Sequence, residues 1–329
     1  MYPLAFSCLV SVLNAPPLRA QDVHVHVSPQ GKGTKESTDD FPTIQMAMDH
    51  APQPGPDGRL YVHIAPGIYD ERVIVTQNRP RTTFLGTGSE PSAVVISAAQ
   101  NARTAQGTFF SETVEINGEG FEADNLTFRN IAGPTGQAVA IAVRSDRAVF
   151  KHCRFLGDQD TLFADYGRQY YLDSFIAGGV DFIFGNAAAV FDHVEIHETR
   201  SGYLTAQSRT AASQKTGYVI LNSKVTSEDL GEQQFFLGRP WREYSRVIVL
   251  QTELPANLNP LGWSPWSGDE TPVHAYYAEW GNVGPGARPR QRASWSHQIS
   301  STDAKQYFPE TFLRGGDGWN PQEEARKLP

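Results

Sequence analysis

Six short segments decide the fold, ADNLTF (123–128), VFKHCRF (149–155), YYLDSFI (170–176), VFDHVEI (190–196), YVILNSKV (218–225) and VIVLQTEL (247–254). Each segment is rich in β-branched and aromatic residues, and Gly, Asn or Asp turns follow it, which is typical of strands in a β-rich fold. The last apolar residues of the segments lie 27, 21, 20, 29 and 29 positions apart. This spacing stays within the range of a solenoid repeat, so the pattern predicts a stack of β-coils.

The sequence between the segments favours an all-β parallel β-helix over an ordinary β-sandwich, which is the alternative. Hairpins would need shorter returns, and a β/α alternation would need amphipathic helices of about 10–15 residues between the strands. One helix is expected, TIQMAMDH (43–50), where it would cap the N-terminal end of the stack. From about Asn257 the chain is rich in Pro, Trp and Gly, and we expect it to pack on the stack as long loops and a tail.

Composition narrows the class of protein. The chain has 329 residues and a net charge of −8, which argues against a DNA or RNA partner. Its 40% of hydrophobic residues are enough for a sizeable core, and no stretch of 18 or more apolar residues predicts a membrane span. No linker-like stretch interrupts residues 21–329, so we expect a single catalytic domain there, acting as a monomer.

Residues 1–20 are expected to form a signal peptide. An apolar run, Leu4–Leu13, is followed by NAPPLRA (14–20), which ends in the small residue Ala20, and polar sequence begins at Gln21. A buried N-terminal strand is the alternative. Cleavage after Ala20 would remove Cys8 and leave Cys153 alone, so that the mature protein would have no intramolecular disulfide. The expected localisation is secreted, either extracellular or periplasmic.

The usual signatures of nucleophilic, nucleotide and metal sites are missing from the sequence. It contains no G-x-S-x-G, no Walker loop, no G-x-G-x-x-G and no H-E-x-x-H. His24 and His26 stand two apart without a third ligand at metal spacing, so they indicate a surface strand. We therefore expect no metal and no cofactor. The chemistry is concentrated instead in two glycine-bounded stretches, GDQDTL (157–162) and GGVDFIFGN (178–186).

Asp181 stands out in the second of these stretches. It lies between Val180 and Phe182, and a buried carboxylate there costs several kcal/mol unless it is paired. The candidate partner is Arg239 in LGRPW (237–241), although a purely structural salt bridge is the alternative. Asp160 precedes Asp181 by 21 residues, about one coil, so the two could stack on one face. Neighbouring carboxylates push their pKa values apart, which suits one to act as an acid and the other as a base or nucleophile.

These residues belong to a longer series of motifs that resembles the pectin methylesterases (pectinesterases). The series comprises GIYDE (67–71), GQAVA (136–140), GDQDTL (157–162), DFIFG (181–185), LGRPW (237–241), GWSPW (262–266) and EWGNVGPG (279–286). The motifs follow in order along nearly the whole chain after residue 20. The resemblance implies a right-handed parallel β-helix and a secreted carbohydrate esterase that hydrolyses the methyl esters of galacturonate residues in pectin.

The resemblance also implies a role for each matching residue. Asp181 would attack the methyl-ester carbonyl, and Asp160 would protonate the departing methanol and then activate the water that hydrolyses the acyl-enzyme. Gln159 and Gln137 would donate hydrogen bonds to the oxyanion, and Arg239 would hold Asp181 ionised. The substrate-binding residues would be Trp241, Arg239, Gln137, Phe184 and Trp266.

One position departs from the plant pattern. Asp158 stands where plant members carry an aromatic residue, which would remove a stacking surface and add negative charge near the cleft. This residue suggests the bacterial type of the family.

Two other interpretations of the function stay open. One is a different activity on the same scaffold (an acyl thioesterase, or a pectate lyase or polygalacturonase), and the other is a non-catalytic β-helix that only binds polysaccharide. A lyase would want clustered acidic residues for calcium, which the motifs lack.

Overall fold

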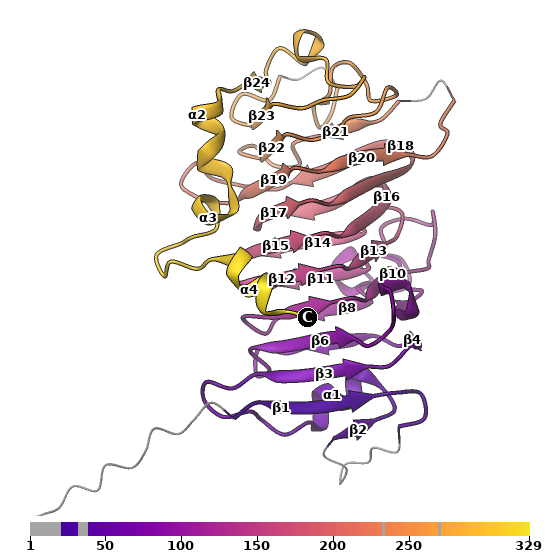
Figure 1. The fold of residues 1–329 in the computed structure, drawn as a ribbon. Helices are drawn as coiled ribbons and strands as arrows, with labels where there is room; N and C mark the ends of the chain where they lie inside the picture. The colour runs from indigo at the N-terminus through magenta and orange to yellow at the C-terminus, as the bar shows by residue number, and fades with distance from the viewer. Residues whose placement is uncertain (1–20, 32–38, 232–233, 269–270) are drawn as a thin grey trace, which may run out of the picture.

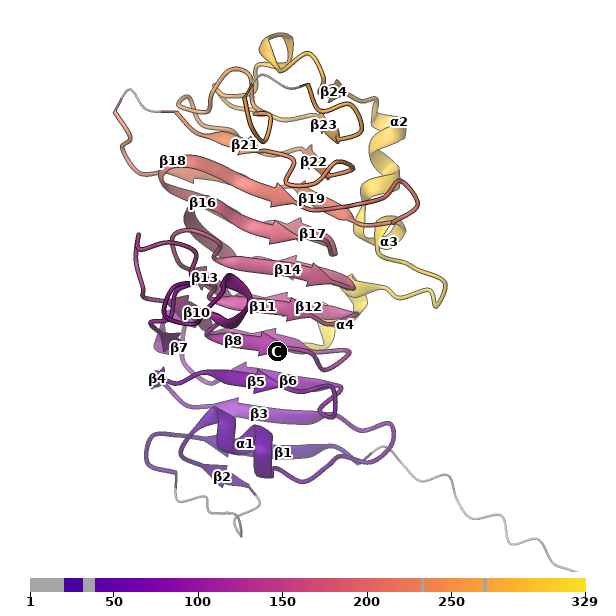
Figure 2. The ribbon, with the colours of Figure 1, turned by 180° about the vertical axis from the view of Figure 1, so that it is seen from behind.

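The protein is a parallel β-helix (Figures 1 and 2). The computed structural model describes residues 21–31, 39–231, 234–268 and 271–329; the expected signal peptide, residues 1–20, lies outside them. All strand pairs in the described residues are parallel, so each turn of the chain adds one rung to every face of the stack. This confirms the β-helix predicted from the repeat spacing and excludes the β-sandwich.

One long sheet forms the first face. Its strands, in spatial order, are β2 (Asp40–Phe41), β1 (Val23–Val27), β3 (Leu60–Ile64), β6 (Thr82–Gly86), β9 (Glu122–Asp124), β12 (Ala148–Lys151), β15 (Arg168–Leu172), β17 (Ala188–Asp192), β19 (Gly217–Leu221), β22 (Arg246–Leu250), β23 (Tyr276–Trp280) and β24 (His297–Gln298).

The second sheet has two arms that join in two long strands. One arm contains β4 (Gly67–Asp70), β7 (Val94–Ala98), β10 (Thr127–Asn130) and β13 (Arg154–Leu156). The other contains β5 (Val73–Val75), β8 (Val114–Ile116), β11 (Ile141–Arg144) and β14 (Leu162–Tyr166). The long strands are β16 (Phe175–Gly185) and β18 (Glu195–Gln207), and β20 (Lys224–Ser227) and β21 (Phe236–Gly238) pair with β18.

Each of the six predicted segments contains a corner rather than a single straight strand. The residue at the corner adopts a positive φ between 48° and 67° in seven successive coils, at Asn125, His152, Asp173, His193, Asn222, Gln251 and Gly281. Asn, Asp and Gly tolerate this left-handed conformation best, which explains the polar residue in the middle of most apolar segments. The corner turns the chain from the first sheet into the second, so the same bend recurs once per coil.

Aromatic side chains stack inside the coils. Phe150, Tyr171 and Phe191 occupy the same row of the first sheet, with ring centroids 4.9 and 4.7 Å apart, and all three are fully buried. Such pairs stabilise the fold by ~0.5–1.5 kcal/mol each beyond the burial of their area. Two features of the sequence therefore mark the repeat: the corner residues and the core aromatic residues.

A helix lies at the N-terminal end of the stack. Helix α1 (Ile44–His50) closes the N-terminal end, and the Thr43 hydroxyl caps it by accepting from the backbone of Met46 at 3.1 Å, as expected for this segment (Figure 1). Short 3₁₀ helices lie in the connections, η1 (Pro91–Ala93), η2 (Thr108–Phe110) and η3 (Pro289–Gln291). No helix in the described part of the chain is long and apolar enough to cross a membrane.

The tail packs along the outside of the first sheet, as expected, but it contains short helices that the sequence pattern did not predict. These are α2 (Ser301–Ala304), η4 (Lys305–Tyr307), α3 (Pro309–Phe312) and α4 (Pro321–Lys327), drawn in yellow in Figure 1. Helices of three to seven residues are too short to show an amphipathic period. Trp319 and Leu328 are buried in an apolar cluster with residues of the sheet such as Val190.

Candidate active site

Strand register places the two predicted oxyanion donors on neighbouring coils. Gln137 pairs with Gln159, and Gln159 pairs with Val180. The same row continues through Tyr203 to Phe236 on the next two coils. Within the described residues neither glutamine side chain has a hydrogen-bond partner, although both face a cavity. Two amide groups are therefore free to donate toward a bound molecule.

The two aspartates face each other across one coil. Leu162 pairs with Ile183, which gives the offset of 21 residues expected between Asp160 and Asp181, and the backbone N–H of Asp160 donates to the carbonyl of Val180 at 3.1 Å. Asp160 is 9% exposed and Asp181 is 5% exposed. Both adopt a positive φ, 65° and 51°. Sparsely populated backbone conformations of this kind cost about 1–3 kcal/mol and cluster at functional sites.

Arg239 binds Asp181 through two parallel hydrogen bonds. Its Nε lies 2.9 Å from Oδ1 and its Nη2 lies 2.6 Å from Oδ2. The backbone of Arg239 follows β21, which pairs with β18, and its N–H donates to the carbonyl of Thr205 at 3.0 Å. The ion pair predicted from two apolar contexts 58 residues apart is therefore formed.

The environment gives the two carboxyl groups different affinities for protons. Burial raises the pKa of Asp160 to about 8; the charge of Asp181 adds to this rise and that of Arg239 opposes it. Burial also raises the pKa of Asp181, while the hydrogen bonds and charge of Arg239 lower it. Because Asp181 alone receives the guanidinium hydrogen bonds, it ionises first and Asp160 keeps its proton at neutral pH. The pair thus offers one carboxylate and one carboxylic acid.

All the residues predicted for catalysis and substrate binding line one cavity of about 290 Å³. Its walls are Thr108, Phe109, Gln137, Gln159, Asp160, Asp181, Phe184, Ala206, Arg239, Trp241 and Trp266. Sequence reasoning missed Thr108, Phe109 and Ala206. Phe109 belongs to η2 and packs on Phe163 at 5.0 Å, and Phe163 stacks on Phe184 at 4.5 Å. The consecutive phenylalanines at 109–110, flanked by polar residues, were the only signal for this wall.

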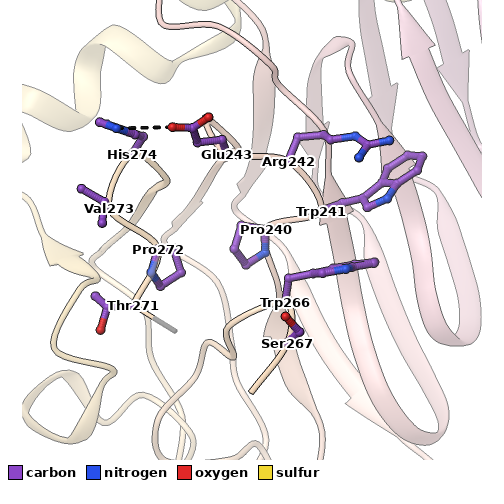
Figure 3. A pocket seen from close by; sticks show the side chains of 10 residues that line it. All are labelled: Pro240, Trp241, Arg242, Glu243, Trp266, Ser267, Thr271, Pro272, Val273 and His274. Carbon is purple, nitrogen blue, oxygen red and sulfur yellow. Dashed lines mark ion pairs between the residues drawn. The ribbon is translucent and has the colours of Figure 1, made fainter. Parts of the chain in front are cut away.

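A second cavity of about 400 Å³ adjoins the first, because Trp241 and Trp266 line both (Figure 3). The segment 271–274 forms the wall opposite Pro240, and Pro272 faces Pro240 across the gap (Figure 3). His274 and Glu243 form an ion pair of 3.4 Å at one end. The two tryptophan rings, 6.4 Å apart, separate the cavities.

The structure changes the interpretation of Asp158. Its carboxylate accepts hydrogen bonds from Nε and Nη2 of Arg200 at 2.8 and 2.9 Å, so its charge is paired, and Asp158 does not line the cavity. The sequence predicted that Asp158 adds negative charge near the cleft, but Arg200 neutralises this charge. Arg200 stands 42 residues away in the sequence, and no local pattern marks it as the partner.

Metal ligands do not gather in the described residues. No group of three or more His, Cys, Asp or Glu side chains there could hold a metal ion. Whether the chemistry needs a metal stays a prediction.

Comparison with known proteins gives consistent results. The family model described as Pectinesterase matches residues 31–317. The chain is 38% identical over 304 residues to a pectinesterase of Daucus carota, which covers 88% of this chain and 94% of that protein. The structure of a pectin methylesterase from carrot superposes with a TM-score of 0.84 at 35% identity, covering 96% of this chain and 98% of the other. A pectin methylesterase in complex with a hexasaccharide superposes with a TM-score of 0.74 at 27% identity, covering 90% and 98%. The similarity to carrot proteins does not support the bacterial type expected from Asp158.

Proposed function

The chain belongs to the pectinesterase family, and we propose that it releases methanol from pectin through a covalent intermediate on Asp181. Its activity is that of a pectinesterase, a carboxylic ester hydrolase acting on pectin. The observation that carries the mechanism is a pair of buried aspartates in one cavity, of which Asp181 is bonded to an arginine. Asp181 is bonded to Arg239, whereas burial beside Asp181 raises the pKa of Asp160 to about 8.

In the first half-reaction a carboxylate oxygen of Asp181 attacks the ester carbonyl. The amides of Gln137 and Gln159 donate to the oxyanion, and their side chains are free for this among the described residues. As the tetrahedral intermediate collapses, the bond to the methoxy oxygen breaks, and Asp160 transfers its proton to that oxygen so that methanol leaves. The product on the enzyme is an acyl group on Asp181.

In the second half-reaction a water molecule replaces methanol. Asp160, now ionised, takes a proton from the water, and the hydroxide oxygen attacks the acyl carbon. The bond between the acyl carbon and Asp181 breaks, which restores the Asp181 carboxylate and leaves Asp160 protonated. The second hydrogen of the water stays on the product, which leaves as the carboxylic acid and releases that proton to solvent to become galacturonate, and the enzyme returns to its starting state.

Aromatic residues are suited to bind the sugar rings next to the ester. Phe184, Trp241 and Trp266 line the catalytic cavity, and the two tryptophans also line the second cavity (Figure 3). Flat apolar rings pack well against the C–H faces of sugars, so we assign the second cavity to a flanking sugar unit of the same chain.

Several properties stay part of the proposal. Export with a signal peptide at residues 1–20, a single catalytic domain at 21–329, a monomeric state, and chemistry without metal or cofactor are expectations from the sequence. Export is consistent with a substrate that is a cell-wall polysaccharide. A bacterial type has no support from the relatives compared.

The decisive assay measures methanol and new reducing ends together on highly methylated pectin. We expect methanol without chain scission; reducing ends without methanol would indicate a depolymerase, and neither product would indicate a binding protein. Asp181→Asn should lower kcat by at least about a thousandfold. Asp173→Asn is the matched control, because Asp173 is also an aspartate with positive φ, but it lies half-exposed at a corner of the coil and not in the catalytic cavity.

A further inference from the structure

The guanidinium of Arg239 lies between two aromatic rings. Its central carbon is 4.0 Å from the ring centroid of Tyr203 and 4.2 Å from that of Trp266. Cations bind ring faces at up to about 6 Å, so both contacts are close ones. The guanidinium of Arg239 is therefore held by two ring contacts and by two hydrogen bonds to the Asp181 carboxylate.

This arrangement limits how Arg239 can move. Two parallel hydrogen bonds to a carboxylate require the guanidinium and carboxylate groups to lie nearly in one plane. The two ring contacts oppose rotation out of that plane. The rings also keep water from the ion pair, which strengthens its electrostatic interaction.

Tyr203 is itself held firmly. Its strand, β18, pairs with β16 at Val180 and with β21 at Phe236, so Tyr203 has a neighbour on each side. Its ring stacks on that of Phe236 with centroids 5.6 Å apart and an angle of 20°. Before it, Gly202 lies so close to the preceding coil that a Cβ would stand 1.8 Å from the carbonyl oxygen of Gly179. The tight packing fixes the backbone that carries the ring.

The two rings differ in their access to substrate. Trp266 is 39% exposed and lines both cavities, whereas Tyr203 lines neither. An effect of Tyr203 on catalysis must therefore pass through Arg239. This distinction allows the positioning role to be measured separately from substrate binding.

We propose that Tyr203 is a positioning residue that fixes the Arg239 guanidinium in the plane of the Asp181 carboxylate, with Trp266 as the second ring in contact with it. The inference rests on the proposed function, since it assumes that Asp181 is the nucleophile. We assign this role to the ring; the Tyr203 hydroxyl also interacts with Arg239, and a phenylalanine at this position removes the hydroxyl while keeping the ring. Loss of the ring lets Arg239 rotate, so that Asp181 is both less well oriented and more easily protonated.

The test compares Tyr203→Phe with Tyr203→Leu in steady-state methanol release across pH. Tyr203→Phe keeps the ring, and we expect kcat within about threefold of wild type and an unchanged acid limb of kcat/KM. Tyr203→Leu should lower kcat about tenfold or more, move the acid limb upward by at least half a pH unit, and change KM by less than about twofold. Tyr203→Met, closer to Tyr in length, replaces the leucine variant if that variant does not fold.

A matched control is available on the same strand as the nucleophile. Phe175 in β16 also carries an arginine over its ring, with Arg154 at 5.4 Å, but this pair lies in the other arm of the sheet. Phe175→Leu should leave kcat and the acid limb unchanged.

Two results would overturn the proposal. One is a folded Tyr203→Leu or Tyr203→Met with wild-type kcat and acid limb; the other is a loss confined to KM, which would make Tyr203 a substrate contact. Either outcome is distinct from failure of the proposed function, because in that case the wild type would release no methanol or Asp181→Asn would keep its activity.

Discussion

Arg239 holds both carboxylate oxygens of Asp181, through Nε at 2.9 Å and Nη2 at 2.6 Å. A lysine could not reproduce these two parallel bonds, because its ammonium is a single point of charge. Burial raises the pKa of Asp181, and the hydrogen bonds and charge of Arg239 oppose this rise. Most of the expected pH behaviour of the enzyme follows from this ion pair.

Removal of this guanidinium should change activity in two separable ways. In Arg239→Leu, burial and Asp160 remain but the opposing charge is gone, so the pKa of Asp181 rises. We expect the acid limb of kcat/KM to move upward by about a unit or more, and the plateau to fall because Asp181 loses its orientation. The measurement is a pH profile of methanol release. A lower plateau with an unshifted limb would make Arg239 a positioning or substrate-binding residue only.

Asp160 should set the basic limb of the pH profile of activity. It has to carry a proton when methanol leaves, and burial raises its pKa to about 8. Activity should therefore fall as pH rises through about 8, and Asp160→Asn should lower kcat by orders of magnitude across the range. Combining it with Asp181→Asn should add little, because the two residues act as a unit. A basic limb that persists in a residually active Asp160→Asn would assign that limb to another group.

The aspartate pair could be predicted from the sequence because the solenoid register is regular there. An offset of 21 residues between Asp160 and Asp181 equals one coil, and the pairing of Leu162 with Ile183 has the same offset. Arg239 could be predicted as the partner because a buried carboxylate needs a cation and LGRPW supplies one in an apolar context. Chemistry and periodicity were sufficient for these three residues.

Tyr203 could not be found in this way because the register shifts beside it. Gly178 pairs with Glu198, an offset of 20, whereas Val180 pairs with Tyr203, an offset of 23. Extra residues between the two pairs form an irregularity, so counting one coil ahead of Val180 lands on the wrong residue. The ion pair of Asp158 with Arg200, which lies inside this irregularity, was hidden for the same reason.

The buried carboxyl group of Glu198 should make the stability of the protein depend on pH. Its side chain is fully buried, and neither carboxyl oxygen has a hydrogen-bond partner in the part of the chain that the structure describes. Burial raises its pKa to about 10; the charge of Arg200 opposes this rise, and the charges of Asp158 and Asp181 add to it. The folded protein keeps this proton while the unfolded chain releases it above its ordinary pKa. The stability of the wild type therefore falls, through this group, as pH rises from about 5 toward 10.

Glu198→Gln should remove that loss. The amide is neutral at every pH, so the variant should match the wild type near pH 5 and become more stable by a few kcal/mol near pH 9. Urea unfolding at both pH values measures the difference. A constant difference between the two proteins would show that Glu198 does not titrate in the folded state as described.

The tail should stabilise the stack mainly through apolar contact. Trp319 is 9% exposed, packs in the cluster on the first sheet and lies 5.4 Å from the guanidinium of Arg168. Trp319→Ala should lower the free energy of unfolding by about 3–5 kcal/mol. Asp317→Ala, which breaks a more exposed ion pair with Arg168, should cost about 1 kcal/mol or less. Equal losses in urea unfolding would contradict this division.

The two tryptophans that separate the cavities should differ in what they do. Trp241 lines both cavities, and its ring centroid lies 6.2 Å from that of Phe184 and 6.4 Å from that of Trp266. The guanidinium over its ring is that of Arg242, at 5.0 Å, and not that of Arg239. Trp241→Ala should therefore raise KM about tenfold without moving the acid limb of kcat/KM. Trp266→Ala removes a ring from the face of Arg239 and a wall from both cavities, so it should raise KM and also move the acid limb upward.

The measurement that checks both expectations is the same pH series on pectin. Val273→Ala is the control, because that side chain is 82% exposed at the edge of the second cavity. An acid limb that moves equally in both tryptophan variants would show that general opening of the cleft, and not contact with the guanidinium, controls the ionisation of Asp181.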